Sequence, residues 1–111
     1  MFFHVFINLD DDRVIDEYDF TDRDEIQSNL CDKLNDSKPF FFKGPSLNSS
    51  EVISTKIYAS NKEIDKLIED SYAQFSSTNI PGVTVMAPLI ERKDMLNSPY
   101  CTDVSQSFKW D

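Results

Sequence analysis

Four aspartates near the start of the chain come closest, by residue type and spacing, to a metal site. Asp10, Asp11, Asp12 and Asp16 offer the carboxylate oxygens that a hard cation such as Ca²⁺ prefers. An EF-hand-like loop counted from Asp10 needs a glycine at its sixth position and a glutamate at its twelfth, where this chain has isoleucine and threonine. We therefore interpret this run as a solvated hairpin turn and predict neither a metal site nor a cofactor.

His4 and two cysteines are the other residues that could carry out catalysis. His4, the only histidine, lies in an apolar run, which favours a structural strand histidine over an acid–base catalyst. Cys31 lies on a predicted helix in an acidic segment, and such surroundings do not lower the pKa of a thiol. Cys31 and Cys101 are far apart and lack metal-ligand spacing, so we expect free thiols. We predict no catalytic residue and no enzyme activity.

Charge is distributed unevenly along the chain. The net charge of the 111 residues is −9, and residues 1–37 alone hold eleven acidic and three basic side chains. A field of one sign repels nucleic acid and anionic membranes and attracts basic partners. Three consecutive phenylalanines, residues 40–42, could stack on bases, but that use requires a basic groove. We therefore predict no nucleic-acid binding.

Length and composition predict one folded domain spanning residues 1–111. A hydrophobic content of 40% with nine phenylalanines argues against intrinsic disorder, and two glycines are too few for a phosphate-binding loop. No apolar run approaches the roughly 18 residues of a membrane span. The apolar start lacks a basic leader and runs directly into Asp10, so we expect a cytoplasmic protein without a signal peptide.

The first half of the chain predicts a β-hairpin followed by a helix. Alternating side chains over residues 3–8 indicate a central strand, and residues 14–20 a second strand. Thr21 is a suitable N-cap with Asp24 three residues later, and the helix is expected to end near Asn35. Its apolar face repeats every fourth residue, at Ile26, Leu30 and Leu34.

The second half predicts further strands and one more helix. Residues 40–42 read as a short strand covered on both faces, and residues 52–59 as a longer strand. A capping box from Ser60 to Glu63 begins a helix that runs to about Phe75, and residues 83–87 suggest a last strand. The order β-β-α-β-β-α-(β) predicts an α+β domain, with a small mixed or antiparallel sheet and two helices. Its opening resembles the β-grasp order.

The acidic first third also contains the best candidates for partner binding. We expect the contacts to come from the acidic hairpin and the start of the first helix, whose carboxylates can dock on a basic protein surface. The simpler interpretation is a solvated face that keeps the protein soluble. The candidate residues are Asp10, Asp11, Asp12, Asp16 and Glu17.

Several short segments of the chain occur in the same order as in a known module. They are Phe3-His4-Val5, Tyr18-Asp19-Phe20-Thr21, Phe40-Phe41-Phe42-Lys43-Gly44, Ser49-Ser50-Glu51-Val52-Ile53 with Lys56-Ile57-Tyr58, and Asp103-Val104-Ser105 with Phe108. This pattern resembles a small N-terminal module of prokaryotic nucleotide-binding proteins that carry a TIR-like (Toll/interleukin receptor-like) domain. Residues 62–99 contribute no landmark to it.

The resemblance implies an accessory module for protein interaction or sensing, at the N-terminus of a longer bacterial anti-phage effector. The catalytic residues of such an effector would lie beyond Asp111, so none is assigned to this chain. Its partner would be the covalently linked effector domain or a separate protein, and self-association stays open. The alternative is a stand-alone acidic inhibitor, a nucleic-acid mimic that binds a basic partner and competes with DNA in a salt-dependent way.

Overall fold

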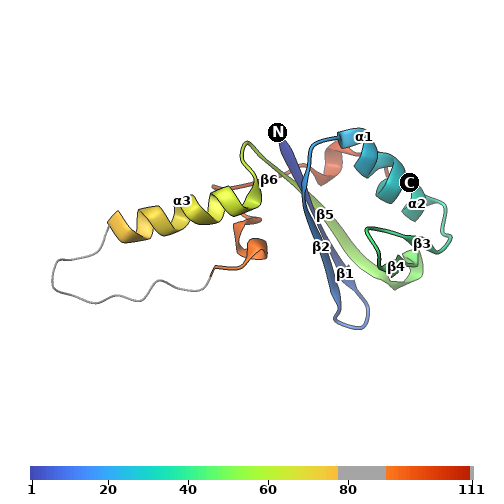
Figure 1. Ribbon diagram of the computed structural model, residues 1–111. Helices are drawn as coiled ribbons and strands as arrows, with labels where there is room; N and C mark the ends of the chain where they lie inside the picture. Colours follow the sequence, from blue (N-terminus) through green and yellow to red (C-terminus); the bar gives the residue numbers. More distant parts are fainter. Residues whose placement is uncertain (78–89, 111) are drawn as a thin grey trace.

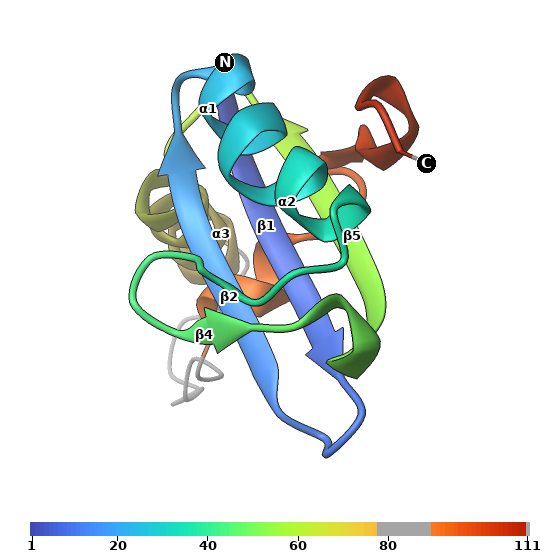
Figure 2. The same ribbon diagram turned by 90° about the vertical axis from the view of Figure 1, so that its right-hand side faces the viewer.

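The computed structural model describes residues 1–77 and 90–110 (Figure 1). Its centre is a four-stranded antiparallel sheet in the order β2-β1-β5-β6. The first helix lies across one face of this sheet, whereas α3 (Ile64–Ser77) meets the other face with its first turns and then extends away from it, as the two views show together (Figure 2). The predicted α+β class with an antiparallel sheet and two helices is confirmed. The strands are β1 (Phe2–Leu9), β2 (Val14–Phe20), β5 (Val52–Ser60) and β6 (Thr102–Asp103).

β1 is an inner strand of the sheet, as its sequence predicts. It pairs with β2 on one side and with β5 on the other. Val5 and Ile7 are fully buried on the face that the first helix covers, together with Ile57 of β5. His4 and Phe6 point to the opposite face because side chains alternate along a strand. His4 is fully buried on this second face, whereas Phe6 is half-buried, so the second face of β1 is only partly covered.

The first helix covers one face of the sheet as α1 (Arg23–Ile26), a π turn (Gln27–Cys31) and α2 (Asp32–Asn35). The predicted end at Asn35 is confirmed, but the predicted N-cap at Thr21 is wrong by one residue. Asp22 has extended backbone angles, and its carboxylate accepts the N–H of Asp24 at 2.9 Å. A carboxylate also interacts favourably with the positive end of the helix dipole, which favours Asp22 over Thr21.

The π turn explains how an apolar repeat of four residues stays on one face. On an ideal α-helix of 3.6 residues per turn, such a repeat drifts by about 40° at each step. In the π turn the N–H of Asp32 donates to the carbonyl of Gln27, five residues earlier. This wider turn compensates for the drift, and Ile26 and Leu30 are both fully buried against the sheet.

The phenylalanine run is exposed on one side, so the prediction of a strand covered on both faces is wrong. β3 (Phe40–Phe41) and β4 (Ser46–Leu47) form a separate two-stranded sheet. Phe42 is 2% exposed and stacks on Phe20 with ring centroids 6.0 Å apart, whereas Phe41 is 78% exposed. An isolated small hairpin packs on the domain through one face only, so the alternate ring points to solvent.

The other face packs against the first turns of the second helix, α3 (Ile64–Ser77), and against a 3₁₀ turn (Arg92–Met95), and α3 then extends away from the sheet (Figure 1). The predicted capping box at Ser60 is wrong, because the Ser60 hydroxyl donates to the carbonyl of Lys62 at 2.6 Å. The N–H of Ile64 donates instead to the carboxylate of Asp19 on β2, at 2.8 Å. No helix in the described part of the chain is long and apolar enough to cross a membrane.

The sheet topology differs from the β-grasp order that the opening resembles. The first helix starts beside the end of β2, and the chain enters β5 at Val52, which lies opposite Leu9 of β1. β5 therefore runs antiparallel to β1, whereas a β-grasp sheet pairs its first and last strands in parallel. The predicted strand at residues 83–87 lies outside the described residues.

β6 was not predicted and pairs with β5 over two positions only. Beyond this pairing the N–H of Val104 donates to the carbonyl of Ile57 at 2.8 Å. The N–H of Ile57 donates to the hydroxyl of Ser105 at 2.7 Å, so a side chain replaces the carbonyl of a neighbouring strand. This contact ends the ladder, because Ser105 begins a 3₁₀ turn (Ser105–Ser107).

Candidate partner-binding surface

Asp10, Asp11 and Asp12 form the turn that joins β1 to β2. All three are exposed, and the turn is closed by the N–H of Leu9, which donates to the carbonyl of Arg13 at 2.9 Å. The Arg13 guanidinium also forms an ion pair with Asp11. The prediction of a solvated hairpin turn is confirmed. Among the described residues, no group of three possible ligands is arranged to hold a metal ion.

Asp16 and Glu17 continue the acidic run along β2, at one edge of the sheet. Asp16 lies opposite Phe6 of β1, whereas Glu17 lies opposite Val5. Neighbouring side chains on a strand point to opposite faces, so Asp16 faces the side of α3 and Glu17 the side of the first helix. The five predicted residues therefore share one edge of the sheet but do not converge on one point.

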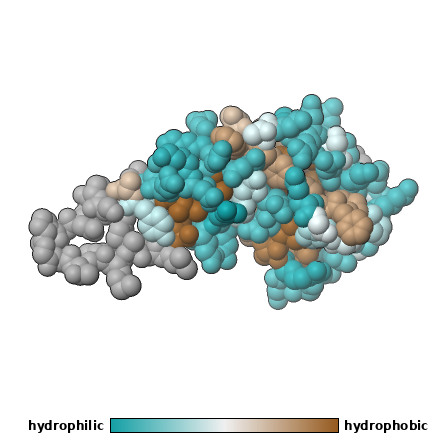
Figure 3. Space-filling model, viewed as in Figure 1, coloured by the Kyte–Doolittle hydropathy of each residue, from teal (hydrophilic) through white to brown (hydrophobic). Residues whose placement is uncertain are grey.

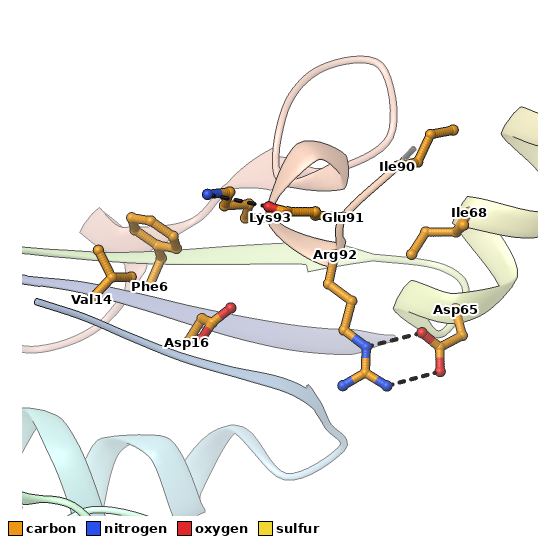
Figure 4. Close-up of a pocket in the computed structure, with 9 residues that line it drawn as sticks. All are labelled: Phe6, Val14, Asp16, Asp65, Ile68, Ile90, Glu91, Arg92 and Lys93. Carbon is orange, nitrogen blue, oxygen red and sulfur yellow. Dashed lines mark hydrogen bonds and ion pairs between the residues drawn. The ribbon is translucent and has the colours of Figure 1, made fainter. Parts of the chain in front are cut away.

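An open cleft of about 580 Å³ lies between the β1–β2 hairpin and the segments that cover this face. Figure 4 shows Phe6 and Val14 on one side, Ile68 and Ile90 on the other, and Asp16 between them. Asp16 is the predicted residue that lines this cleft. The remaining lining residues are charged: Asp65, Glu91, Arg92 and Lys93.

The basic side chains of the cleft are paired within it. The Arg92 guanidinium donates to both carboxylate oxygens of Asp65, at 3.1 and 3.2 Å, which raises the pKa of Arg92 above its ordinary value. Lys93 Nζ lies 3.2 Å from a carboxylate oxygen of Glu91. These pairs leave little uncompensated positive charge in the cleft.

Asp16 contributes an uncompensated negative charge. Its carboxylate accepts a hydrogen bond from the Tyr18 hydroxyl at 2.6 Å, and it has no basic partner in the described part of the chain. Burial raises the pKa of Tyr18 well above its usual range, and the bond to Asp16 acts in the same direction. Tyr18 is therefore a neutral donor, so the charge of Asp16 is available to a ligand.

His4 is fully buried and held by its neighbours. Its Nδ1 accepts the backbone N–H of Asp19 at 3.1 Å, so Nε2 carries the proton and donates to the Ser60 hydroxyl at 2.8 Å. Burial lowers the pKa of His4, and the Asp19 carboxylate, 3.8 Å from Nδ1, opposes this effect. The structure agrees with the predicted structural role, since both ring nitrogens are used inside the domain.

Both cysteines are free, as predicted, and both are buried. Cys31 lies in the core under the first helix and Cys101 in the core on the opposite face of the sheet. Burial raises the pKa of Cys31 to about 12 and also raises the pKa of Cys101. Neither thiol is ionised near neutral pH, so neither is an activated nucleophile.

The sequence did not predict the cleft. Ile68 and Arg92 are far from Val14 and Asp16 in the chain, and only the tertiary fold brings them together. A partial signal was present on β2, where alternation places Val14 and Asp16 on the same face. Which segments frame that face could not be known from the local pattern.

Comparison with known proteins adds no relationship. No family model, curated protein or solved structure matches the chain. The resemblance of the sequence landmarks to a TIR-associated module stays a prediction.

Proposed function

We propose that the chain is a non-catalytic protein-interaction module that docks a basic partner on its acidic hairpin. We define the acidic hairpin as Asp10, Asp11, Asp12, Asp16 and Glu17. The observation that carries the proposal is the concentration of these carboxylates at one edge of the sheet, where Arg13 supplies the only positive charge of the hairpin itself. Such a field speeds encounter with a basic surface and selects against acidic partners.

The non-catalytic part of the proposal is supported by the residues best suited to catalysis. His4 has no ring nitrogen free for a substrate, and the thiols of Cys31 and Cys101 are buried with raised pKa values. A nucleophile needs a lowered pKa or an adjacent base. These groups therefore fit structural roles.

The biological context of the proposal comes from the sequence resemblance. In that context the module belongs to a bacterial TIR-like defence effector and works in the cytoplasm. The basic partner is then the effector's linked domain or a separate protein that carries the trigger. Regulation of the effector by docking follows from either arrangement.

A docking face fits the geometry better than a nucleic-acid mimic does. A mimic presents a row of charges along one surface, in the manner of phosphates. Here Asp16 and Glu17 point to opposite faces of the sheet, and the three aspartates of the turn lie at its tip. The stand-alone inhibitor is thus the second candidate.

The proposal is tested by neutralising the acidic hairpin with isosteric amides. The variant combines Asp10→Asn, Asp11→Asn, Asp12→Asn, Asp16→Asn and Glu17→Gln. A control of equal net charge combines five exposed acids elsewhere: Asp24→Asn, Asp32→Asn, Asp36→Asn, Glu63→Gln and Glu69→Gln. The probe is a fluorescein-labelled oligolysine peptide, and binding is measured by fluorescence anisotropy over a range of salt concentrations.

We expect the hairpin variant to bind oligolysine at least about tenfold more weakly, because exposed charge pairs contribute about 0.2–1 kcal/mol each. The control variant should lose clearly less. Equal losses in both variants would mean that only net charge matters and that the acidic face serves solubility. If the wild-type chain displaces duplex DNA from a basic DNA-binding protein and the hairpin variant does not, the inhibitor takes precedence.

A further inference from the structure

The cleft beside Phe6 continues across the sheet. A second hollow, of about 270 Å³, shares Phe6 and Lys93 with the cleft and extends to Tyr58 on β5 and to Asn97. Phe6 is half-buried and forms part of both linings. An elongated depression of this kind suits an extended polypeptide better than a compact small molecule.

Apolar groups on both sides of the cleft can contact a ligand. Val14 is 45% exposed on β2, and Ile68 and Ile90 are half-buried on the opposite side (Figure 4). In the view of Figure 3 most of the surface is hydrophilic, and hydrophobic atoms show beside α3 and toward the β3–β4 end. An apolar side chain seated in the cleft would remove these groups from water.

The charges around the cleft restrict what can enter it. Arg92 and Lys93 are already paired with carboxylates, whereas Asp16 is hydrogen-bonded only by the neutral Tyr18 hydroxyl in the described part of the chain. The turn aspartates lie on the same hairpin and strengthen the negative field. A second copy of this chain, with a net charge of −9, is repelled, and a basic segment is attracted.

Resting on the proposed function, we infer that the cleft binds an extended segment of the basic partner. An apolar side chain of that segment sits between Val14 and Ile68, and a neighbouring lysine or arginine pairs with Asp16. The hairpin then provides attraction at long range, and the cleft provides the specific contact. Recognition thus requires a basic residue next to an apolar one, not positive charge alone.

The test uses blocked peptides of alternating residues as probes. A lysine–leucine peptide carries both a basic and an apolar residue. The lysine–serine peptide lacks the apolar residue, the serine–leucine peptide lacks the charge, and the glutamate–leucine peptide reverses the charge. Affinity is measured by anisotropy, and the binding site is mapped by amide chemical shifts in NMR. Because Val14 is exposed, Val14→Ser tests the cleft without disturbing the core, and Ile68→Ser is the second variant. Ile53→Ser, at a residue 67% exposed on β5, is the matched control.

We expect the lysine–leucine peptide to bind about tenfold more tightly than the lysine–serine peptide, as burial of one leucine side chain predicts. Val14→Ser and Ile68→Ser should remove that advantage, Ile53→Ser should keep it, and the glutamate peptide should not bind. Amide shifts on lysine–leucine binding should include Val14, Asp16 and Ile68.

Other outcomes overturn the inference in distinguishable ways. Equal binding of the lysine–leucine and lysine–serine peptides would mean that the cleft contributes nothing to affinity and that the acidic hairpin alone binds the basic peptide. If neither peptide bound, the proposed function would fail as well. Equal affinity for the serine–leucine peptide would mean that the occupant need not be basic. Sedimentation of the chain as a dimer that Val14→Ser dissociates would assign the cleft to a second copy.

Discussion

The face of the sheet under the first helix and the face under α3 differ in how completely they are closed. On the first face the apolar residues of β1 meet Ile26 and Leu30, and all of them are buried. On the second face β1 contributes His4, Phe6 and Asn8, the core is smaller, and the cleft opens beside Phe6. The apolar surface of one face is closed, and the other face leaves an open cleft beside Phe6.

This difference follows from the alternation of one strand. The apolar face of β1 requires a continuous cover, which the first helix and the β3–β4 hairpin provide. The polar atoms on the other face require partners instead: Asp19 and Ser60 for His4, and Ser54 for Asn8 at 3.0 Å. Fixed polar contacts of this kind hold the strands without needing a cover over the whole face.

The largest predicted effect compares one leucine from each core. Leu30→Ala removes a fully buried side chain from the closed face and should destabilise the protein by about 3–5 kcal/mol. Leu67→Ala, at a residue 9% exposed in the smaller core, should cost about 2 kcal/mol because less cavity is left. Urea unfolding followed by circular dichroism measures both values.

The exposed Ile53→Ala serves as the control for this pair and should change stability by less than about 0.5 kcal/mol. Equal losses for the two leucine variants would show that the half-open face contributes as much stability as the closed one. The two faces would then differ in shape but not in their contribution to stability.

An intermediate effect is expected at Asp19, which holds the second face together. Asp19→Ala removes the acceptor for the N–H of Ile64 and places alanine at a φ of 65°, so we expect a loss of about 2 kcal/mol. Asp19→Asn keeps an oxygen acceptor and tolerates this φ, and it should lose less than half as much. Hydrogen exchange should show opening in α3 but not in α1 or α2. Equal opening of α3 and of the first helix would contradict the view that the two faces of the sheet are stabilised independently.

The smallest effect is a pH dependence from His4. Burial lowers the pKa of His4 in the folded state below its ordinary value of 6.5. As pH falls, the His4 imidazole therefore takes up its second ring proton in the unfolded chain before it does so in the folded one. Stability should therefore fall from about pH 7 downward until the folded pKa is passed. The pKa values of Asp70 and Asp103 are lowered in the folded state, so these two residues make stability depend on pH only below about pH 5. Urea midpoints between pH 5 and 7.5 should lose this slope in His4→Gln.

Local patterns predicted the elements that local physics determines. The alternation along β1 and the helix end at Asn35 were both visible in the sequence, because they depend on neighbouring residues. The start of α3 was not, since its first N–H is accepted by Asp19 on another strand rather than by Ser60. Phe41 was placed wrongly because nothing in its own segment says whether one face or two will be covered.

The candidate site likewise has one part that the local sequence predicts and one part that depends on the tertiary fold. The solvated turn and the carboxylates of the acidic hairpin could be predicted from the sequence, since charge and turn chemistry are local properties of residues 10–17. That these residues bind a partner stays a prediction. The cleft could not be predicted, because Arg92 and Ile68 reach it only through the tertiary fold. Of the predicted residues, Asp16 belongs to both the hairpin and the lining of the cleft, because β2 places its side chain on that face.

The π turn has a consequence for comparing this chain with others. It holds one residue more than an α-helical path between Asp22 and Asn35 requires, and it leaves both helix ends in place. A relative whose helix is regular throughout is expected to lack one residue between Gln27 and Cys31. Alignments across this helix will then need a gap of a single position, and forcing the two sequences into one register would misassign every core residue on one side of it.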